Sequence, residues 1–265
     1  MSSEELLDLA RTVGREAALY VVGARPVGRV DVSSTKSSPT DVVTAIDEAC
    51  EELIRSRILA VRPNDSFQGE EGDDIIGTSG VEWIVDPIDG TVNFVYGLPF
   101  YAVSIAAAVD GEVEVGFVIN IANADEFTAV RGQGSYLNSS DAGAIRLEAP
   151  VVPRLEHALI ATGYNYIPEI RAKQADAVAR MLPQVRDIRR TGSAALDLCG
   201  LAAGRYDAYV EQGLMPWDLA AGGLIAREAG IVISGLGAIP DQRLVMAAHP
   251  SISGEFFDLV RACGF

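Results

Sequence analysis

Hydrophobic and polar positions alternate along the chain in patterns that predict helices first and strands later. Apolar residues recur at helical spacing through positions 6–20 behind two serines, which predicts a capped amphipathic helix at the start. The small polar segment Ser33–Thr40 predicts a flexible loop. Helical periodicity follows over Asp41–Val61, and Pro63 ends it.

From Ser66 onward, short apolar runs predict strands. In the first half of the chain these are Ser66–Gln68, Val81–Val85, Phe100–Val109 and Glu112–Asn120, the last two forming a hairpin. In the second half the predicted strands are Ala158–Thr162, Ala208–Glu211, Ile231–Ile233 and Val245–Ala247. The predicted helices there are Ile170–Met181, Ser193–Ala203, Trp217–Ala229 and Ser253–Ala262. We therefore expect layers of helix on sheet on helix, with a boundary between two lobes near the prolines at position 150.

Length and composition indicate a globular protein with a substantial core. The 265 residues allow one large domain or two of ordinary size, and 49% of them are hydrophobic. The 21 Lys and Arg against 37 Asp and Glu give a net charge of -16 at pH 7. This acidity argues against nucleic acid as a main partner, and it opposes a phosphorylated substrate unless divalent cations reverse the local field.

The sequence carries no pattern typical of export, membrane insertion or disulfide bonding. Its start has no basic region followed by an apolar run, and no apolar stretch approaches roughly 18 residues. We expect a cytoplasmic protein without a membrane partner. The cysteines Cys50, Cys199 and Cys263 are odd in number and widely spaced, which argues against a disulfide framework or a zinc site.

The segment Asp86–Thr91, with the sequence Asp-Pro-Ile-Asp-Gly-Thr, directly follows an apolar strand. Its proline stiffens the turn, and Asp86 and Asp89 offer hard oxygen ligands suited to Mg²⁺. Gly90 permits close approach of the backbone to a ligand, and a helix that starts at Thr91 offers N–H groups to an anion. The alternative interpretation is a plain turn, because these residue types are common in turns.

Two further acidic motifs make the plain turn less favourable. Gly69-Glu-Glu-Gly72 follows a predicted strand, and Asp218 opens a predicted helix. Taken alone, Glu70 and Glu71 fit a solvated loop, and Asp218 fits a helix N-cap. Together with Asp86–Thr91, these motifs favour a cation site.

At this point the chain resembles the inositol monophosphatase family of Mg²⁺-dependent, lithium-sensitive phosphatases. The resemblance is carried by Gly69-Glu-Glu71, Asp86-Pro-Ile-Asp-Gly-Thr91 with Asn93-Phe94, and Trp217-Asp-Leu-Ala-Ala-Gly222, in the family's order and spacing. Supporting matches are Thr35–Asp41 with Ala45–Asp47, and Arg189–Ala195 with Glu211.

The resemblance covers essentially the whole chain and implies a fold. That fold is the α+β or α/β layered sandwich with alternating αβαβα layers that the family shares with fructose-1,6-bisphosphatase. It implies one domain over residues 1–265, with an N-terminal lobe of about 1–148, a C-terminal lobe of about 149–265 and a metal site between them.

The resemblance also implies a set of metal ligands. Glu70, Asp86 and the carbonyl of Ile88 would hold a first Mg²⁺, and Asp86, Asp89 and Asp218 a second. Glu70 would help to place a third, so two to three Mg²⁺ are expected in the site. Lithium would inhibit by occupying the second cation position.

The expected catalytic residues are Glu70, Thr91 and Asp47, of which the last two would orient the attacking water. Lys36 resembles a residue on a mobile loop that closes toward the metals in the family. A solvated lysine is the alternative interpretation of Lys36.

The substrate contacts that the resemblance implies are Ile88, Asp89, Gly90, Thr91, Arg189, Ala194, Glu211 and Asp218. The N–H groups of Gly90 and Thr91 would bind phosphate oxygens, whereas the carboxylates and the backbone at Ala194 would meet polyol hydroxyls. The alternative interpretations are that Glu211 is an exposed strand end and that Arg189 is a surface arginine. Tyr164 and Asn165 stand where some relatives carry small hydroxyl residues, which affects the expected specificity.

We therefore expect a phosphoric monoester hydrolase that converts myo-inositol 1-phosphate to myo-inositol and inorganic phosphate by in-line attack of metal-activated water. Related substrates are fructose 1,6-bisphosphate, 3'-phosphoadenosine 5'-phosphate and histidinol phosphate. A homodimer is expected, since family members are commonly dimers. The hypothesis from another class is a non-catalytic interaction scaffold, whose mark would be loss of the acidic ligands.

Overall fold

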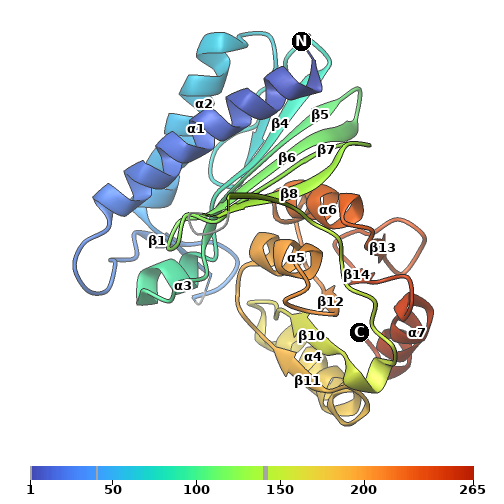
Figure 1. The fold of residues 1–265 in the computed structure, drawn as a ribbon. Coiled ribbons are helices and arrows are strands. Elements are labelled where there is room, and N and C mark those ends of the chain that lie inside the picture. Colours follow the sequence, from blue (N-terminus) through green and yellow to red (C-terminus); the bar gives the residue numbers. More distant parts are fainter. Residues whose placement is uncertain (1, 40, 140–142) are drawn as a thin grey trace.

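The computed structural model describes residues 2–39, 41–139 and 143–265, and Thr40, at the end of the predicted polar loop, lies outside them. Two large sheets alternate with three layers of helices (Figure 1). The order of layers is helix, sheet, helix, sheet, helix, so the expected αβαβα sandwich is confirmed.

The larger sheet contains seven strands in the order β3-β4-β5-β6-β7-β8-β9 among the described residues. They are β3 Ser66–Gly69, β4 Val81–Asp89, β5 Ala102–Val109, β6 Glu112–Asn120, β7 Glu126–Val130, β8 Gly134–Ser139 and β9 Gly143–Arg146. β3 runs parallel to β4, and the other neighbours are antiparallel. β3 and β4 therefore end at the same edge of the sheet.

The smaller sheet contains five described strands in the order β11-β10-β12-β14-β13. They are β10 Leu159–Thr162, β11 Asp187–Arg189, β12 Ala208–Glu211, β13 Val232–Ser234 and β14 Val245–Ala248. β10, β11 and β12 are parallel, and β14 pairs antiparallel with β12 and β13.

The helices form the outer and middle layers. α1 Ser3–Ala24 and α2 Ala45–Val61 cover one face of the larger sheet, while α5 Ala194–Ala202 and α6 Pro216–Glu228 lie between the two sheets. α4 Pro168–Met181 and α7 Ser253–Cys263 cover the outer face of the smaller sheet. Short elements complete the description: α3 Thr91–Tyr96, the strand pair β1 Ser34–Thr35 and β2 Val42–Val43, and two 3₁₀ turns, η1 Leu155–His157 and η2 Leu182–Gln184.

β6 is the strand on which helices from both layers pack most closely. A Cβ on Gly14 of α1 would lie 2.2 Å from the ring of Phe117. On the opposite face, a Cβ on Gly116 would lie 2.8 Å from the carbonyl oxygen of Ala221 in α6. Because neighbouring residues of a strand face opposite sides, positions 116 and 117 receive one helix each. Glycine thus permits both contacts.

Three sequence predictions about elements are corrected. The helix predicted from Asp41 begins at Ala45, because residues 42–43 pair with β1 and the Thr44 side chain caps the helix. The segment predicted as a loop from Ser33 contains β1. The third correction concerns four strands that the sequence pattern missed: β7, β8, β9 and β11. β9 is exposed throughout, so no buried face marks it in the sequence.

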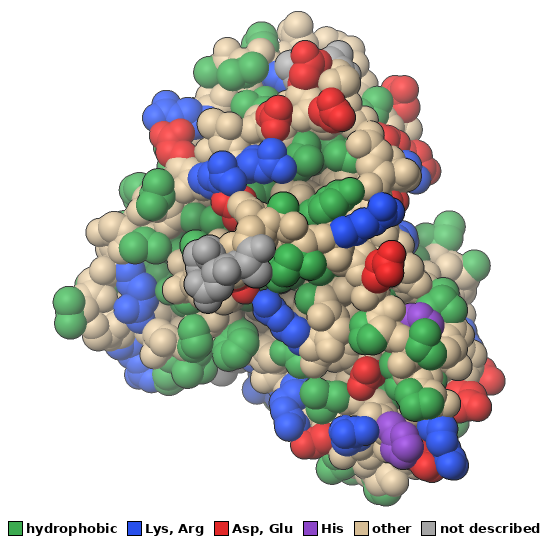
Figure 2. All heavy atoms as spheres, in the orientation of Figure 1, with side chains coloured by type: hydrophobic (Ala, Val, Ile, Leu, Met, Phe, Trp, Pro, Cys, Tyr) green, Lys and Arg blue, Asp and Glu red, His purple; other side chains and the backbone are tan. Residues whose placement is uncertain are grey.

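The cysteines, the helix hydrophobicity and the surface charges complete the description of the fold. The cysteines Cys50, Cys199 and Cys263 are free and buried. No helix within the described ranges is long and apolar enough to cross a membrane. On the face drawn in Figure 2, acidic and basic side chains are interspersed, and hydrophobic side chains occur in small groups between them.

Candidate active site

The end of β4 carries a β-bulge that brings two aspartates together. Asp86 lies opposite Ser104 and Asp89 lies opposite Ala102, so a step of three residues on β4 matches a step of two on β5. In a regular strand, residues three apart point to opposite faces. The extra residue turns both carboxylates to the same side.

Asp218 of α6 completes a cluster of three carboxylates. One oxygen each from Asp86, Asp89 and Asp218 lies within 4.8 Å of the others. Asp218 occupies the third position of α6, where its Oδ2 accepts a hydrogen bond from the N–H of Met215 at 2.6 Å. Its interpretation as the N-cap is therefore wrong, since Met215 holds that position.

The three carboxylates share a desolvated space that disfavours their charged forms. Burial raises the pKa of Asp86 well above its ordinary value, and the charges of Glu70, Asp89 and Asp218 raise it further. Burial also raises the pKa of Asp218, with Asp89 and Glu70 adding to the shift. For Asp89, burial outweighs the hydrogen bond from Ser193 and raises the pKa to about 6. A cation bound between the three carboxylates would favour the charged form of each.

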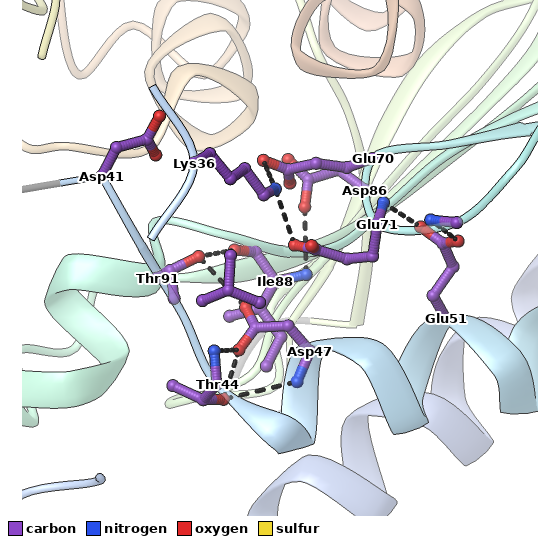
Figure 3. A network of polar contacts seen from close by, with 12 residues as sticks. Lys36, Asp41, Thr44, Asp47, Glu51, Glu70, Glu71, Asp86, Ile88 and Thr91 are labelled. Atoms are coloured by element: carbon purple, nitrogen blue, oxygen red, sulfur yellow. Dashed lines mark hydrogen bonds and ion pairs between the residues drawn. The ribbon is translucent and has the colours of Figure 1, made fainter. Parts of the chain in front are cut away.

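Glu70 follows β3 and reaches the same edge of the sheet as Asp86. Figure 3 shows its carboxylate beside Asp86 and facing Lys36, whose Nζ lies 2.8 Å from Glu70 Oε1 and 2.9 Å from Glu71 Oε1. Burial alone would lower the pKa of Lys36, but these two carboxylates raise it above its ordinary value. Lys36 comes from the short hairpin β1–β2, so the loop residue singled out in the sequence does face the acidic cluster.

Asp47 and Thr91 meet as the sequence predicts. The Thr91 hydroxyl lies 3.1 Å from Asp47 Oδ1 and 3.1 Å from the carbonyl oxygen of Ile88. Asp47 is fixed at the start of α2 by a reciprocal cap, in which its Oδ2 accepts hydrogen bonds from the N–H and the hydroxyl of Thr44. Burial raises the pKa of Asp47 to about 6 against these hydrogen bonds.

Asp89 connects β4 to the start of α5. Its Oδ2 accepts hydrogen bonds from the Ser193 hydroxyl at 2.6 Å and from the N–H of Ala195 at 2.7 Å. The N–H of Ala194, predicted to meet a polyol hydroxyl, donates to Asp89 Oδ1 at 3.3 Å. Carboxylates are favourable at a helix N-terminus, so α5 holds Asp89 in place.

Glu211 lines the part of the pocket away from β4. It sits at the end of β12, and its Oε2 accepts a hydrogen bond from the Tyr209 hydroxyl at 2.6 Å. Gly163 makes room for it, because a Cβ there would lie 2.0 Å from Glu211 Oε1. Burial raises the pKa of Glu211 to about 7, against the favourable charge of Arg190.

The arginine at the pocket is Arg190 and not the predicted Arg189. Arg189 ends β11 on the outside, where its Nη1 pairs with Asp187 Oδ2 at 2.6 Å. Arg190 lines the pocket instead and hydrogen-bonds the Tyr166 hydroxyl. Adjacent residues of an extended chain point in opposite directions, so only one of two neighbouring arginines faces the site.

Most of the residues singled out in the sequence line one pocket. Those that line it are Glu70, Asp86, Ile88, Asp89, Gly90, Thr91, Ala194, Glu211 and Asp218, together with Tyr164 and Asn165. Asp47 lies behind this lining and reaches it through Thr91. Lys36 reaches it through Glu70.

Sequence reasoning missed Glu51, Tyr166 and Arg190. Glu51 is 1% exposed and binds the loop that carries Glu70. A signal for it exists, because the buried face of α2 is formed by positions 47, 50, 51, 54 and 58. A glutamate on an apolar helix face needs a partner. Arg190 was overlooked because it is one of two adjacent arginines.

Comparison with known proteins agrees with the fold and the motifs. A model of the inositol monophosphatase family matches residues 2–262. Inositol-1-monophosphatase SuhB of Mycobacterium tuberculosis is 44% identical in a match that covers 94% of this chain and 91% of the relative. The solved structure of Mycobacterium tuberculosis SuhB superposes with a TM-score of 0.85 at 41% identity, covering 99% of this chain and 98% of that one. A relative named Nus factor SuhB, from Vibrio cholerae, is 39% identical over 232 residues, covering 86% of this chain and 84% of that relative.

The alternating layers, with an acidic pocket lined from both sheets, define a layered α/β protein. The family model and the relatives both extend over nearly the whole chain. The chain belongs to the inositol monophosphatase family.

Proposed function

We propose that the protein is a Mg²⁺-dependent phosphate monoester hydrolase whose substrate is myo-inositol 1-phosphate. The observation that carries the proposal is the convergence of Asp86, Asp89 and Asp218 within 4.8 Å in a desolvated pocket. The name of the Mycobacterium tuberculosis relative supports inositol 1-phosphate as the substrate.

The donor set fits Mg²⁺. Asp86, Asp89 and Asp218 offer carboxylate oxygens, Glu70 lies beside them, and the carbonyl of Ile88 faces the Thr91 hydroxyl at 3.1 Å. Hard oxygen donors of this kind suit Mg²⁺. When bound, two to three Mg²⁺ ions would make a hydroxide-like nucleophile available near neutral pH and stabilise the leaving alkoxide.

The chain's own residues would orient the water and receive its proton. The Thr91 hydroxyl can donate its proton to Asp47 Oδ1 and accept a hydrogen bond from a water at the same time. Asp47, with its pKa raised to about 6, is ionised at pH 7 and close enough in pKa to hold a transferred proton. Glu70 would bind the cation nearest this water.

The rest of the pocket would hold the substrate. The phosphate would lie against the N–H groups of Gly90 and Thr91, and polyol hydroxyls would meet Glu211, Asp218 and the backbone at Ala194. Glu211 Oε2 already accepts a hydrogen bond from the Tyr209 hydroxyl. Its Oε1 is therefore the oxygen proposed to accept a hydrogen bond from the substrate. Lys36 would give up its ion pair with Glu70 when a cation binds there, and the loop that carries Lys36 would close toward the metals.

Further properties belong to the same proposal. We expect lithium to inhibit by occupying the position between Asp86, Asp89 and Asp218. We also expect a cytoplasmic homodimer, with each chain a single domain of two lobes, about 1–148 and 149–265. A substrate panel of inositol 1-phosphate, fructose 1,6-bisphosphate, 3'-phosphoadenosine 5'-phosphate and histidinol phosphate at saturating Mg²⁺ would rank the substrates.

A second candidate is a role in protein interaction, favoured by the relative named Nus factor SuhB. The retained acidic cluster argues against a scaffold without activity. Activity in phosphate release assays, with no activity in the absence of divalent cations, would exclude the scaffold as the sole function.

The variant Asp218→Asn tests the proposal most directly. Asn keeps an oxygen that can accept from the N–H of Met215, so the start of α6 should remain intact. It removes a charged cation ligand, and turnover should fall roughly a thousandfold or more. Melting curves check that the variant folds. Near-wild-type turnover in a folded Asp218→Asn protein would refute the role of Asp218.

A further inference from the structure

Glu51 lies beneath the loop that carries Glu70, although it belongs to a different element. It extends from the buried face of α2, one helical turn after Asp47. Figure 3 shows its carboxylate pointing at the backbone of the loop, away from the acidic cluster itself. The side chain is 2% exposed, so its carboxylate needs hydrogen-bond partners within the protein.

The Glu51 carboxylate accepts hydrogen bonds from two consecutive backbone N–H groups. Oε2 accepts from the N–H of Glu71 at 2.8 Å, and Oε1 accepts from the N–H of Gly72 at 2.8 Å. On the other side of Glu70, Gly69 is held in the β3–β4 ladder opposite Val85. Glu70 is therefore fixed between a strand and a carboxylate.

Arg55 balances the buried charge from the next turn of α2. Its Nη2 lies 2.7 Å from Glu51 Oε1 and 3.4 Å from the carbonyl oxygen of Asp73. The Arg55 guanidinium also lies 5.0 Å from the ring centre of Phe67, in β3. The pair thus joins α2 to β3 and to the segment that follows it.

The two glycines of the Gly69-Glu-Glu-Gly72 motif provide the space for this pair. A Cβ on Gly69 would lie 2.4 Å from the Glu51 carboxyl carbon. A Cβ on Gly72 would lie 2.4 Å from Arg55 Nη2 and 2.9 Å from Glu51 Oε1. Neither glycine has a positive φ, so close approach explains them better than backbone conformation.

We propose that Glu51, supported by Arg55, is a positioning residue that holds Glu70 in place for cation binding. It would not touch substrate or cation. Because a carboxylate accepting two N–H groups fixes the direction of the backbone, loss of this contact would let Glu70 move away from Asp86. The inference rests on the proposed Mg²⁺ site.

The test is Glu51→Gln, with Glu52→Gln as the matched control. The Gln amide has one acceptor and one donor end, so one of the two loop N–H groups would face another donor. Glu52 is the next residue of the same helix and pairs with Arg55 at 3.3 Å, but its side chain is 69% exposed. Mg²⁺ affinity by calorimetry, and kcat with the Mg²⁺ concentration for half-maximal activity, are measured for each.

Glu51→Gln should weaken Mg²⁺ affinity about tenfold or more, the usual effect of losing a group that orients a metal ligand. The Mg²⁺ concentration for half-maximal activity should rise in parallel, with kcat at saturating Mg²⁺ close to wild type. Glu52→Gln should change neither. A folded Glu51→Gln protein with wild-type Mg²⁺ affinity would overturn the inference, even if its melting temperature fell, because the role would then be purely structural.

Gly72→Ala provides a second route if Glu51→Gln does not fold. It keeps every charge and pushes on the Glu51–Arg55 pair, so it should also weaken Mg²⁺ affinity, and an unchanged affinity would overturn the inference. The wild-type protein separates the two proposals. A wild type that binds no Mg²⁺ overturns the proposed function together with this inference, whereas a wild type that binds Mg²⁺ as tightly as both variants overturns this inference alone.

Discussion

Asp89 shows how one residue connects the two halves of the pocket. It ends β4 of the larger sheet, and its carboxylate accepts hydrogen bonds from Ser193 and Ala195 at the start of α5. The motif around Asp89 predicts it as a ligand, and its place in the cluster with Asp86 and Asp218 is consistent with that prediction. Its contacts with α5 were not predictable from the motif, because Ser193 lies 104 residues further along the chain.

The misassigned arginine and the missed glutamate have the same physical origin. Arg189 and Arg190 are identical in the sequence, and only the direction of the chain after β11 decides which one faces the pocket. Glu51 looks like an ordinary charge on a helix until the fold brings the N–H groups of Glu71 and Gly72 to it. Residue types are read directly from a sequence, but the direction of each side chain depends on the fold.

The variant Glu211→Gln tests hydroxyl recognition at a single residue. Gln retains an oxygen for the Tyr209 hydroxyl, so the end of β12 should keep its structure while losing the charge. A hydrogen bond to a charged group contributes about 1.5–3 kcal/mol, so kcat/KM for inositol 1-phosphate should fall about tenfold to a hundredfold. For an aryl phosphate without hydroxyls, kcat/KM should change little.

Steady-state kinetics with both substrates measure this discrimination directly. Tyr209→Phe is the control for the buried partner of Glu211. An equal fall in kcat/KM for both substrates of the Glu211→Gln protein would show that Glu211 serves hydrolysis in general and not recognition of hydroxyls.

At the scale of elements, hydrophobic periodicity predicted the long helices and the central strands. It extended α2 too far toward the N-terminus, because Thr44 and Asp47 form a reciprocal cap that begins the helix at Ala45. It also ended the strand at Val85, although β4 continues through a bulge to Asp89. Caps and bulges depend on side-chain hydrogen bonds and on a neighbouring strand, which periodicity does not report.

The packing of α1 on β6 supports a prediction with a control in the same helix. Gly14→Ala places a methyl group within 2.2 Å of the Phe117 ring, so α1 or the ring must move. Overpacking of this kind lowers the free energy of unfolding by about 1–3 kcal/mol. For a chain of this size, that corresponds to a fall in melting temperature of about 2–4 °C per kcal/mol.

Gly23→Ala is the control, since a Cβ there has no atom within 4 Å. The same substitution at this open position should raise the free energy of unfolding by about 0.4–1 kcal/mol, because alanine restricts the unfolded chain. Denaturant titrations of both variants provide the comparison. Equal effects at the two positions would contradict the close contact between α1 and β6.

At the scale of the whole molecule, the acidic residues oppose folding in the absence of cations. The net charge is -16, and the pocket collects Glu70, Asp86, Asp89, Glu211 and Asp218 from both sheets and from α6. Burying like charges together raises their pKa values. The sandwich therefore carries a destabilised acidic centre that a bound cation would neutralise.

This arrangement predicts how stability depends on pH. Burial raises the pKa of Asp47 and Asp89 to about 6 and that of Glu211 to about 7. Between the ordinary carboxyl values near 4 and these raised values, the folded state binds more protons than the unfolded state. The free energy of unfolding of the metal-free protein should therefore fall as pH rises from 5.5 to 7.5. Carboxylates whose pKa is lowered, such as Asp65, are ionised in both states throughout this window and do not alter the sign.

Calorimetry at the two pH values, with EDTA and with saturating Mg²⁺, measures the effect. In EDTA the melting temperature should be several degrees lower at pH 7.5 than at pH 5.5, at about 2–4 °C per kcal/mol. Mg²⁺ should raise the melting temperature at pH 7.5 much more than at pH 5.5, because protons compete for the same carboxylates.

Asp218→Asn should raise the metal-free melting temperature at pH 7.5, since one repelling charge is gone, and should reduce the effect of Mg²⁺. A metal-free melting temperature that increases over this pH range, with no response to Mg²⁺, would contradict a cation-neutralised acidic centre.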